Sequence, residues 1–437
     1  MLWSLLTLST KYTQGMCLGM TEVTGFNKVK QRIKEKLSGN FVRNVATLAT
    51  GTAASQVITM IFAPFITRVY GPEAYGLQGV FISTVGLVTI LAALSYPIAI
   101  ILPRYDRDAL SIAKLSIIIS VVITTVVFIL ILFYRNELPS IMHTEMLMPF
   151  INLVPIAMIS SVFASVLNQW LIRKNAFKVT AIFGVVNTLV LNGLKTVGGL
   201  VSPVAMVLIS SNIIGGVLGT ALTYIAWKCV SKKNHNDCDK ESTQVRVKGK
   251  WELAKEYSDF PILRTPQNLI NAASQSLPIF LLAAFFGASS AGHYTIALTV
   301  LGVPSGLIAG SVMSVFYPKV TKAVHSGEDI RKLIIRATIA MAAVGAFPFI
   351  LVIAYGPELF QLVFGKEWSV AGEYAQLLSF WLFLQYINKP AVSAIPALRI
   401  QGGLLLYELF STAAKIIALW IGFSVFKSDI AAIAAFS

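Results

Sequence analysis

Long apolar stretches follow one another along nearly the whole chain, separated by short polar segments. A helix needs roughly 20 mostly apolar residues to cross the hydrocarbon core of a bilayer. Eleven stretches reach that length, at about 44–69, 77–101, 112–134, 147–171, 178–199, 203–228, 260–286, 292–316, 332–355, 370–395 and 402–424. A twelfth begins at Ile430 and is too short to span. The pattern predicts an all-α integral membrane protein with 11 or 12 transmembrane helices.

The composition agrees with a membrane protein. Of 437 residues, 56% are hydrophobic and only 13% are charged, and the mean hydropathy is +0.73. A soluble domain carries about 25% charged residues. The net charge of +15 does not indicate a nucleic-acid partner, because the basic residues recur in short clusters between apolar stretches instead of gathering on one soluble domain. Three cysteines do not make a disulfide framework.

The distribution of Lys and Arg predicts the orientation. Cytoplasmic loops of membrane proteins carry an excess of these residues. Of the 35 in this chain, all but seven lie in alternate loops beginning with the N-terminal segment. The seven others are Arg68, Arg135, Lys195, Arg264, Lys366, Lys415 and Lys427. We therefore expect a multi-pass membrane protein with its N-terminus in the cytoplasm.

The longest polar stretch divides the predicted helices into two groups. It covers residues 229–258 and is rich in Lys, Asn and Asp. We predict a basic cytoplasmic segment at 1–43, a first lobe of six helices at 44–228, this linker loop, and a second lobe at 259–437. Apolar and basic positions at 26–37 fit an amphipathic helix on the inner leaflet or, equally well, a solvated basic tail.

An apolar hairpin at 50–104 recurs loosely at 272–319. The matches, in order, are AASQ at 53–56 and at 272–275, Gly71 with Gly287, Gly76 with Gly292, and Pro103 with Pro318. Their common order and nearly constant offset predict two pseudo-symmetric six-helix lobes. Internal repeats of this kind are typical of secondary transporters.

Three cations and one carboxylate stand out among the ionisable residues of the predicted spans. An ionisable group in the bilayer costs several kcal/mol unless it faces a wet cavity or a partner. Arg264, Lys415 and Lys195 are therefore candidates for a cationic cavity that receives an anionic substrate. Alternatively, Glu408 pairs with Lys415 two turns away, and Arg264 reaches back to the interface.

Amides form a second set of candidates. The ones that we expect in a polar lumen, together with Glu408, are Gln56, Asn168, Asn187, Asn268, Asn271 and Gln275. Such a lumen can bond sugar hydroxyls. The alternative role is hydrogen bonding between neighbouring helices, which is usual for amides in membranes.

Hinges and gates are predicted from proline and glycine. Pro64 and Pro278 occupy similar places in the two repeats, and each frees a backbone carbonyl and can bend its helix. Gly71 and Gly76 mark the first turn of the repeat. Ordinary usage in membrane helices explains the prolines as well.

Catalytic and metal-binding motifs are missing. No P-loop GxxxxGK[ST] and no HExxH occurs, which disfavours ATP-driven transport by this chain alone. Cys229, His235 and Cys238 lack a fourth ligand nearby. We predict no enzyme activity, no cofactor and no metal.

The run FAPFITRVYGPEAYGLQGVFISTVGLVTILAALSYPIAIILPR resembles the polysaccharide repeat-unit flippases of the Wzx or O-antigen translocase type. These belong to the multidrug/oligosaccharidyl-lipid/polysaccharide (MOP) exporter superfamily, which includes the MATE transporters. The turn R-x-Y-G-P-E-x-Y-G at Arg68–Gly76 is the most specific piece, and LVFGKEW at 362–368 looks like the outer loop between helices 9 and 10.

The resemblance implies transport of an undecaprenyl-pyrophosphate-linked glycan to the periplasmic leaflet by alternating access between two lobes. It implies membrane lipid, and a polysaccharide polymerase and chain-length regulator, as partners. Three alternatives stay open: a cation-coupled multidrug exporter of the same superfamily, a lipid II flippase, and a membrane polymerase or ligase for glycans. Short outer loops disfavour the last, and the excess of basic over acidic residues in the spans disfavours the exporter.

Overall fold

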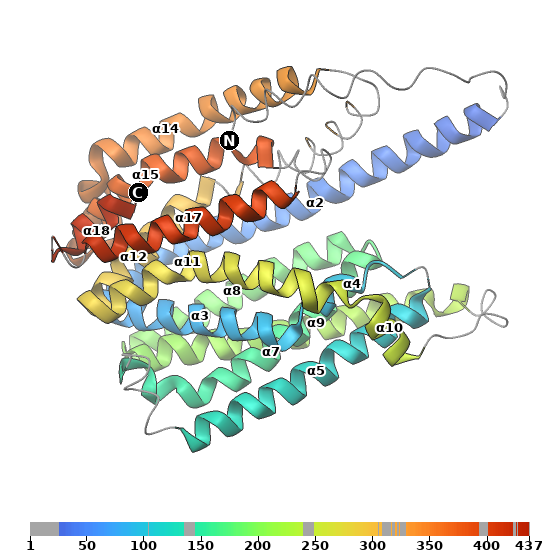
Figure 1. Ribbon diagram of the computed structural model, residues 1–437, viewed down its shortest axis with the longest axis horizontal. Coiled ribbons are helices and arrows are strands. Elements are labelled where there is room, and N and C mark those ends of the chain that lie inside the picture. The colour runs from blue at the N-terminus through green and yellow to red at the C-terminus, as the bar shows by residue number, and fades with distance from the viewer. Residues whose placement is uncertain are drawn as a thin grey trace.

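A computed structural model describes residues 26–103, 105–134, 145–238, 249–304, 306–307, 316, 320, 323, 329–392, 401–422, 425 and 427–436. Within these ranges the chain forms helices joined by short turns, with no strand. Long, roughly parallel helices run the length of the molecule (Figure 1). The all-α membrane architecture predicted from the apolar stretches is confirmed.

Eight helices of the described chain are long and apolar enough to cross a membrane. They are α2 (Phe26–Val69), α3 (Pro72–Ala93), α5 (Asp106–Phe133), α7 (Val154–Arg173), α8 (Phe177–Val201), α9 (Ala205–Cys238), α11 (Thr265–Phe286) and α14 (Ile330–Phe364).

The other three predicted spans are also helical where they are described, as α12 (Ala288–Pro304), α15 (Ser369–Ile387) and α17 (Gln401–Ile421). Short helices complete the fold: α4 (Tyr96–Ala99), the 3-10 helices η2 (Glu145–Leu153) and η5 (Lys366–Trp368), α10 (Lys250–Glu256), the π-helix η3 (Phe260–Arg264) and α18 (Asp429–Phe436).

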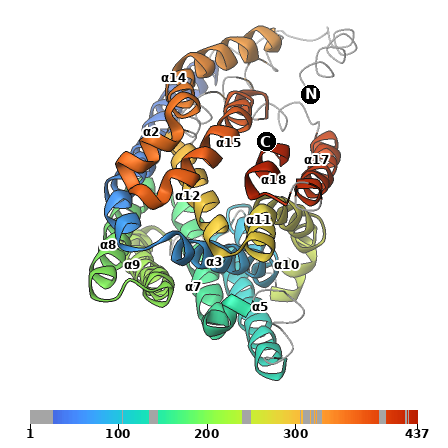
Figure 2. The ribbon, with the colours of Figure 1, turned by 90° about the vertical axis from the view of Figure 1, so that its left-hand side faces the viewer.

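The helices gather into two groups that meet along α3 and α12. In the end view, α5, α7, α8 and α9 lie on one side and α14, α15, α17 and α18 on the other, with α3 and α12 between them (Figure 2). Helix α3 packs closely on α12, and the two contribute Val80, Phe81 and Tyr294 to a buried apolar core. The repeat predicted from the two hairpins therefore corresponds to the contact between the two groups.

The expectation of one continuous helix over 77–101 is wrong. Helix α3 ends at Ala93, because Leu94 (φ 45°) and Ser95 (φ 56°) are both left-handed. The chain then starts the short helix α4, in which Pro97 occupies the first turn. Hydropathy alone does not detect such a break, because every residue around it is apolar or small.

Both polar segments expected at helix ends are partly helical. Residues 26–43 form the first turns of α2, so the basic N-terminal segment continues into the first span without a break. In the linker, α9 extends to Cys238 and α10 follows at Lys250, whereas 239–248 lies outside the described residues. We call the end of the bundle with Gly71 and Gly365 the outer end, and the end with Ser95 the inner end, after the predicted orientation.

Candidate functional site

One face of α11 is polar over three turns. Arg264, Asn268, Asn271 and Gln275 recur at intervals of three or four residues, so they line one side of the helix. Arg264 Nη1 donates to Gln267 Oε1 at 2.9 Å, and Gln275 Nε2 donates to Asn271 Oδ1 at 2.6 Å. Arg264, Asn271 and Gln275 are exposed in the bundle. A transmembrane helix whose polar face stays uncovered by protein is suited to line a water-filled path.

Lys415 of α17 lies beside α11 close to the outer end of this face. Its Nζ lies 3.4 Å from Ser274 Oγ of α11 and 5.1 Å from the ring centre of Trp381 on α15. Three helices of the second lobe thus converge on one half-buried ammonium. Lys415, a candidate for the cationic cavity, therefore lies beside the helix that carries Asn268, Asn271 and Gln275.

The inner end of this face contacts the first lobe through Ser95. Thr265 Oγ1 donates to Ser95 Oγ at 3.1 Å, and Asn268 Nδ2 donates to the same oxygen at 3.1 Å. Thr265 and Ser95 are both buried. The left-handed break after α3 thereby places the Ser95 hydroxyl against the start of α11, and this polar contact joins the two lobes at the inner end.

At the outer end, α3 and α12 cross with their backbones in direct contact. A Cβ on Gly76 would lie 1.7 Å from the Ala288 carbonyl oxygen, and a Cβ on Gly292 would lie 1.8 Å from the Pro72 carbonyl oxygen. Gly76 follows Pro72 by four residues as Gly292 follows Ala288. The contact is therefore reciprocal, as a pseudo-two-fold relation between the lobes requires. Only glycine at both positions permits this approach.

A second outer contact ties the end of α2 to the turn between α14 and α15. Trp368 Nε1 donates to the Thr67 carbonyl at 3.1 Å, and Arg68 Nη2 donates to the Leu362 carbonyl at 3.1 Å. The Tyr75 ring meets the Trp368 indole edge-on, with centroids 5.2 Å apart. The two stretches that carry the sequence resemblance, Arg68–Gly76 and 362–368, therefore touch each other. Together with the crossing of α3 and α12, they close the outer end.

A family model described as "Polysaccharide biosynthesis protein" matches residues 65–373, well over half of the chain. The chain belongs to the polysaccharide biosynthesis protein family. A search of curated proteins finds no match.

Solved structures with the same fold are transporters of the MOP superfamily. The lipid II flippase MurJ in an inward closed conformation has a TM-score of 0.67 and 13% identity, covering 89% of this chain and 84% of that one. An inward-facing MATE family multidrug resistance transporter has a TM-score of 0.61 and 14% identity, and the match covers 87% of this chain and 90% of that one. An outward-facing MATE family transporter has a TM-score of 0.56 and 14% identity, and the match covers 91% of each chain. The predicted MATE-like fold is confirmed for this family member.

The other described polar candidates belong to α2, α7 and α8 and not to α11 or α17. Lys195 on α8 is half-buried, and its carbonyl accepts from Tyr70 Oη at 3.0 Å. Asn187 on α8 packs against Gly219 of α9, and its buried Oδ1 has no hydrogen bond among the described residues. Asn168 is exposed on α7, and Gln56 of α2 contacts Gly306. The side chain of Glu408 lies outside the described residues.

The predicted hinges differ in their surroundings. Pro64 and Pro278 lie inside the continuous helices α2 and α11, and the described non-helical backbone inside a predicted span falls instead at Leu94, Ser95 and Tyr355. Gly76 lies at the α3–α12 crossing, as described above, whereas Gly71 is the N-cap of α3 with an ordinary φ of −71°.

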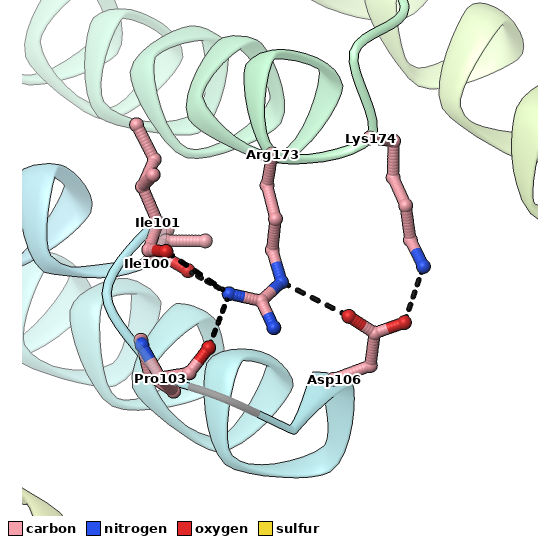
Figure 3. Close-up of polar contacts among 6 residues, drawn as sticks. All are labelled: Ile100, Ile101, Pro103, Asp106, Arg173 and Lys174. Carbon is pink, nitrogen blue, oxygen red and sulfur yellow. Dashed lines mark hydrogen bonds and ion pairs between the residues drawn. The ribbon is translucent and has the colours of Figure 1, made fainter. Parts of the chain in front are cut away.

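Asp106 and Arg173 join the inner ends of α5 and α7 (Figure 3). Arg173 Nε donates to Asp106 Oδ1 at 3.0 Å, and Lys174 contacts the other carboxylate oxygen. Arg173 Nη1 also lies within 3.2 Å of the carbonyls of Ile100, Ile101 and Pro103. The Arg173 side chain is only 10% exposed. Through these bonds the cluster holds three inner helix ends together.

A group of hydrogen-bonded side chains around one carboxylate at the outer end was not predicted from the sequence. Asp429, at the start of α18, accepts from Ser290 Oγ of α12 at 2.8 Å and from the Tyr374 hydroxyl of α15. The His293 ring lies edge-on to both Tyr374 and Trp368, and its Nε2 is 3.2 Å from the Glu367 carbonyl, to which it donates. No sequence motif reveals this group, because its members are far apart in the chain: Ser290 and Asp429 are separated by 139 positions.

Asp429 gives a pH-dependent prediction. Burial alone raises the pKa of this carboxyl, but the hydrogen bonds from Tyr374, Ser290 and the Ile430 amide outweigh burial and lower the pKa below 3.8. A lowered pKa stabilises the folded protein at neutral pH, and this stabilisation is lost only as the pH falls through the lowered value. We expect Asp429→Asn to lower the melting temperature at pH 7, and the difference from the parent to shrink as the pH is reduced to 3. A difference independent of pH would contradict the assignment.

Proposed function

We propose that the protein is an inner-membrane flippase that moves undecaprenyl-diphosphate-linked oligosaccharide repeat units, of O-antigen or a related surface polysaccharide, to the periplasmic leaflet. Membership of a polysaccharide biosynthesis family and the likeness to a structure titled as a lipid II flippase support this proposal. The observation that carries it is the polar face of α11 with Lys415 beside it. A cation and a row of amides at mid-membrane match a head group that combines a diphosphate with sugars.

In this proposal the diphosphate is bound by the cations of the second lobe. Arg264 at the inner start of the face is exposed and bonds only a neutral amide among the contacts described, and Lys415 lies about two and a half turns further outward on the facing helix. Guanidinium and ammonium groups form charge-assisted hydrogen bonds with phosphate oxygens. Asn268, Asn271 and Gln275 bond sugar hydroxyls, and the prenyl chain stays in lipid. Lys195 is assigned a secondary role in the first lobe.

Alternating access requires the contacts between lobes to break in turn. Two of these contacts lie at opposite ends: the Ser95 bonds to Thr265 and Asn268 at the inner end, and the crossing of Gly76 and Gly292 at the outer end. Breaking the inner bonds opens a path to the cytoplasm and breaking the outer contact opens a path to the periplasm. The N-terminus is cytoplasmic in this scheme.

The second candidate is a multidrug exporter, because several neighbours in fold are MATE transporters. A cavity for cationic drugs needs buried carboxylates. The described part of the α11 face instead carries Arg264 and meets Lys415. We therefore favour the anionic lipid-linked glycan. A polymerase and a chain-length regulator are the partners that this role would require.

The proposal is tested by complementation of a strain that lacks its own O-unit flippase, scored by surface polysaccharide. We expect the parent chain to restore polysaccharide, and Arg264→Ala and Lys415→Ala each to reduce it by about tenfold or more, because each removes a charge-assisted contact. Lys332→Ala is the matched control, because this lysine is 77% exposed and its surface ion pair with Asp329 contributes little.

Expression of each variant in the membrane is measured by immunoblot. If all variants restored polysaccharide equally, Arg264 and Lys415 would not belong to the binding site, whereas the flippase function would still stand. No restoration by the parent, together with drug resistance on expression, would favour the exporter.

A further inference from the structure

The aromatic face of Trp381 lies in the candidate site and is covered by Lys415. The ammonium is 5.1 Å from the ring centre, within the range of a cation–π contact. The same ammonium reaches Ser274 on α11, one residue before Gln275 and three after Asn271. An indole face, an ammonium and two amides therefore share one region at mid-helix, contributed by α15, α17 and α11.

This arrangement makes the covering of Trp381 reversible. A cation–π contact to a half-buried ring is weaker than a charge-assisted bond between an ammonium and a phosphate oxygen. An anion that arrives beside Ser274 draws the Lys415 ammonium away from the ring. The indole face that is then uncovered is flat and apolar, and the Asn271 and Gln275 amides lie within one turn of Ser274 on α11.

A sugar ring has the matching chemistry. Its C–H groups form an apolar face that packs on an aromatic ring, and its hydroxyls at the rim bond to amides. Ligand sites commonly combine an aromatic surface with a few polar groups in this manner.

We propose that Trp381 is the residue that binds the sugar adjacent to the diphosphate, and that Lys415 couples the two parts of the head group. Lys415 covers Trp381 in the empty site and leaves it for the diphosphate, so the sugar subsite becomes available only when the anion is bound. This inference rests on the proposed function. According to this inference, Trp381 of α15 is the side chain by which the protein selects a glycosylated lipid over the lipid carrier without sugar.

The test is equilibrium binding to the full chain in lipid nanodiscs with two probes. One probe is undecaprenyl diphosphate, and the other is the same lipid carrying one N-acetylglucosamine. The variants are Trp381→Leu, which removes the aromatic face, Trp381→Phe, which keeps one, and Lys415→Gln. Trp420→Leu is the matched control, because Trp420 is 61% exposed on α17.

We expect Trp381→Leu to weaken binding of the glycosylated probe by about tenfold and to leave binding of undecaprenyl diphosphate within about twofold. Trp381→Phe recovers most of the difference, and Lys415→Gln weakens both probes. Equal weakening of both probes by Trp381→Leu would overturn the inference, because Trp381 would then only position Lys415. An unchanged affinity for both would overturn it as well.

Failure of the inference is distinguishable from failure of the proposed function. If the parent binds neither probe above the level of empty nanodiscs, the proposed function fails. If the parent binds both probes and Trp381→Leu does not discriminate between them, only the sugar subsite fails.

Discussion

Gly76→Ala is expected to abolish transport while the protein still inserts into the membrane. The added Cβ would lie 1.7 Å from the Ala288 carbonyl oxygen and 3.0 Å from the Gly292 nitrogen. Both are backbone atoms, so no side chain can rotate away and α3 must separate from α12. Overpacking of this kind costs about 1–3 kcal/mol or more. Because the cost falls on the state in which the outer end is closed, the variant cannot complete the cycle.

The reciprocal substitution makes this prediction sharper. Gly292→Ala would bring its Cβ to 1.8 Å from the Pro72 carbonyl oxygen, so we expect the same loss. The double variant adds little, since either change alone already separates the helices. Gly86→Ala and Gly302→Ala are the controls on the same two helices, because a Cβ at either position meets nothing within 4 Å.

Closure is measured directly with a thiol at the crossing. Ala288→Cys is introduced after the native cysteines are replaced by serine, and its labelling by an impermeant maleimide is followed in right-side-out vesicles. Ala288, whose carbonyl faces Gly76, is 4% exposed, so slow labelling is expected in the parent background and fast labelling with Gly76→Ala. Normal transport and slow labelling in Gly76→Ala would contradict the role of the crossing.

Arg173→Ala is expected to destabilise the first lobe more than other substitutions of a basic residue at the inner end. The change removes the donors of four hydrogen bonds, one to Asp106 and three to the carbonyls that end the α3–α4 segment. Removing one partner of a fully buried ion pair costs about 3–5 kcal/mol, and the cost here is smaller because the Asp106 side chain is 38% exposed. We expect a lower melting temperature in detergent and reduced amounts in the membrane.

Lys178→Ala provides the matched control for Arg173. Lys178 is an exposed cation at the start of α8, close in sequence to Arg173, and its loss changes the net charge equally. Arg173→Lys keeps the charge but not the forked geometry, and should recover only part of the stability. A melting temperature of Arg173→Ala equal to that of Lys178→Ala would show that the cluster does not hold the inner helix ends.

The predicted repeat and the polar residues of helix 7 show what a sequence reveals about this fold. Correspondence between Gly76 and Gly292 was visible as a repeated spacing, and the structure explains it as one reciprocal crossing. Polar positions at intervals of three and four on α11 were recognisable for the same reason, because helical periodicity maps directly onto a face.

Features made by tertiary contact were not predictable. Pro97 is the local sign of an interruption after α3, but Leu94 and Ser95 are left-handed without being glycine, so the sequence does not indicate where the helix ends. Asp429 acquires its role from Ser290 and Tyr374, which are distant in the chain. Position within a span grouped Lys195 with Arg264 and Lys415, but depth in the membrane does not determine which helix face a side chain occupies, and Lys195 lies on α8.

The measurement that tests the central claim most directly is transport by the purified protein in proteoliposomes. A radiolabelled undecaprenyl-diphosphate-linked oligosaccharide is placed in both leaflets, and the fraction open to an external glycosidase is followed with time. We predict that the parent chain renders nearly all of the glycan accessible, that Lys415→Ala renders only the outer half accessible, and that a cationic dye is not moved. Dye efflux with no movement of the lipid-linked glycan would contradict the account.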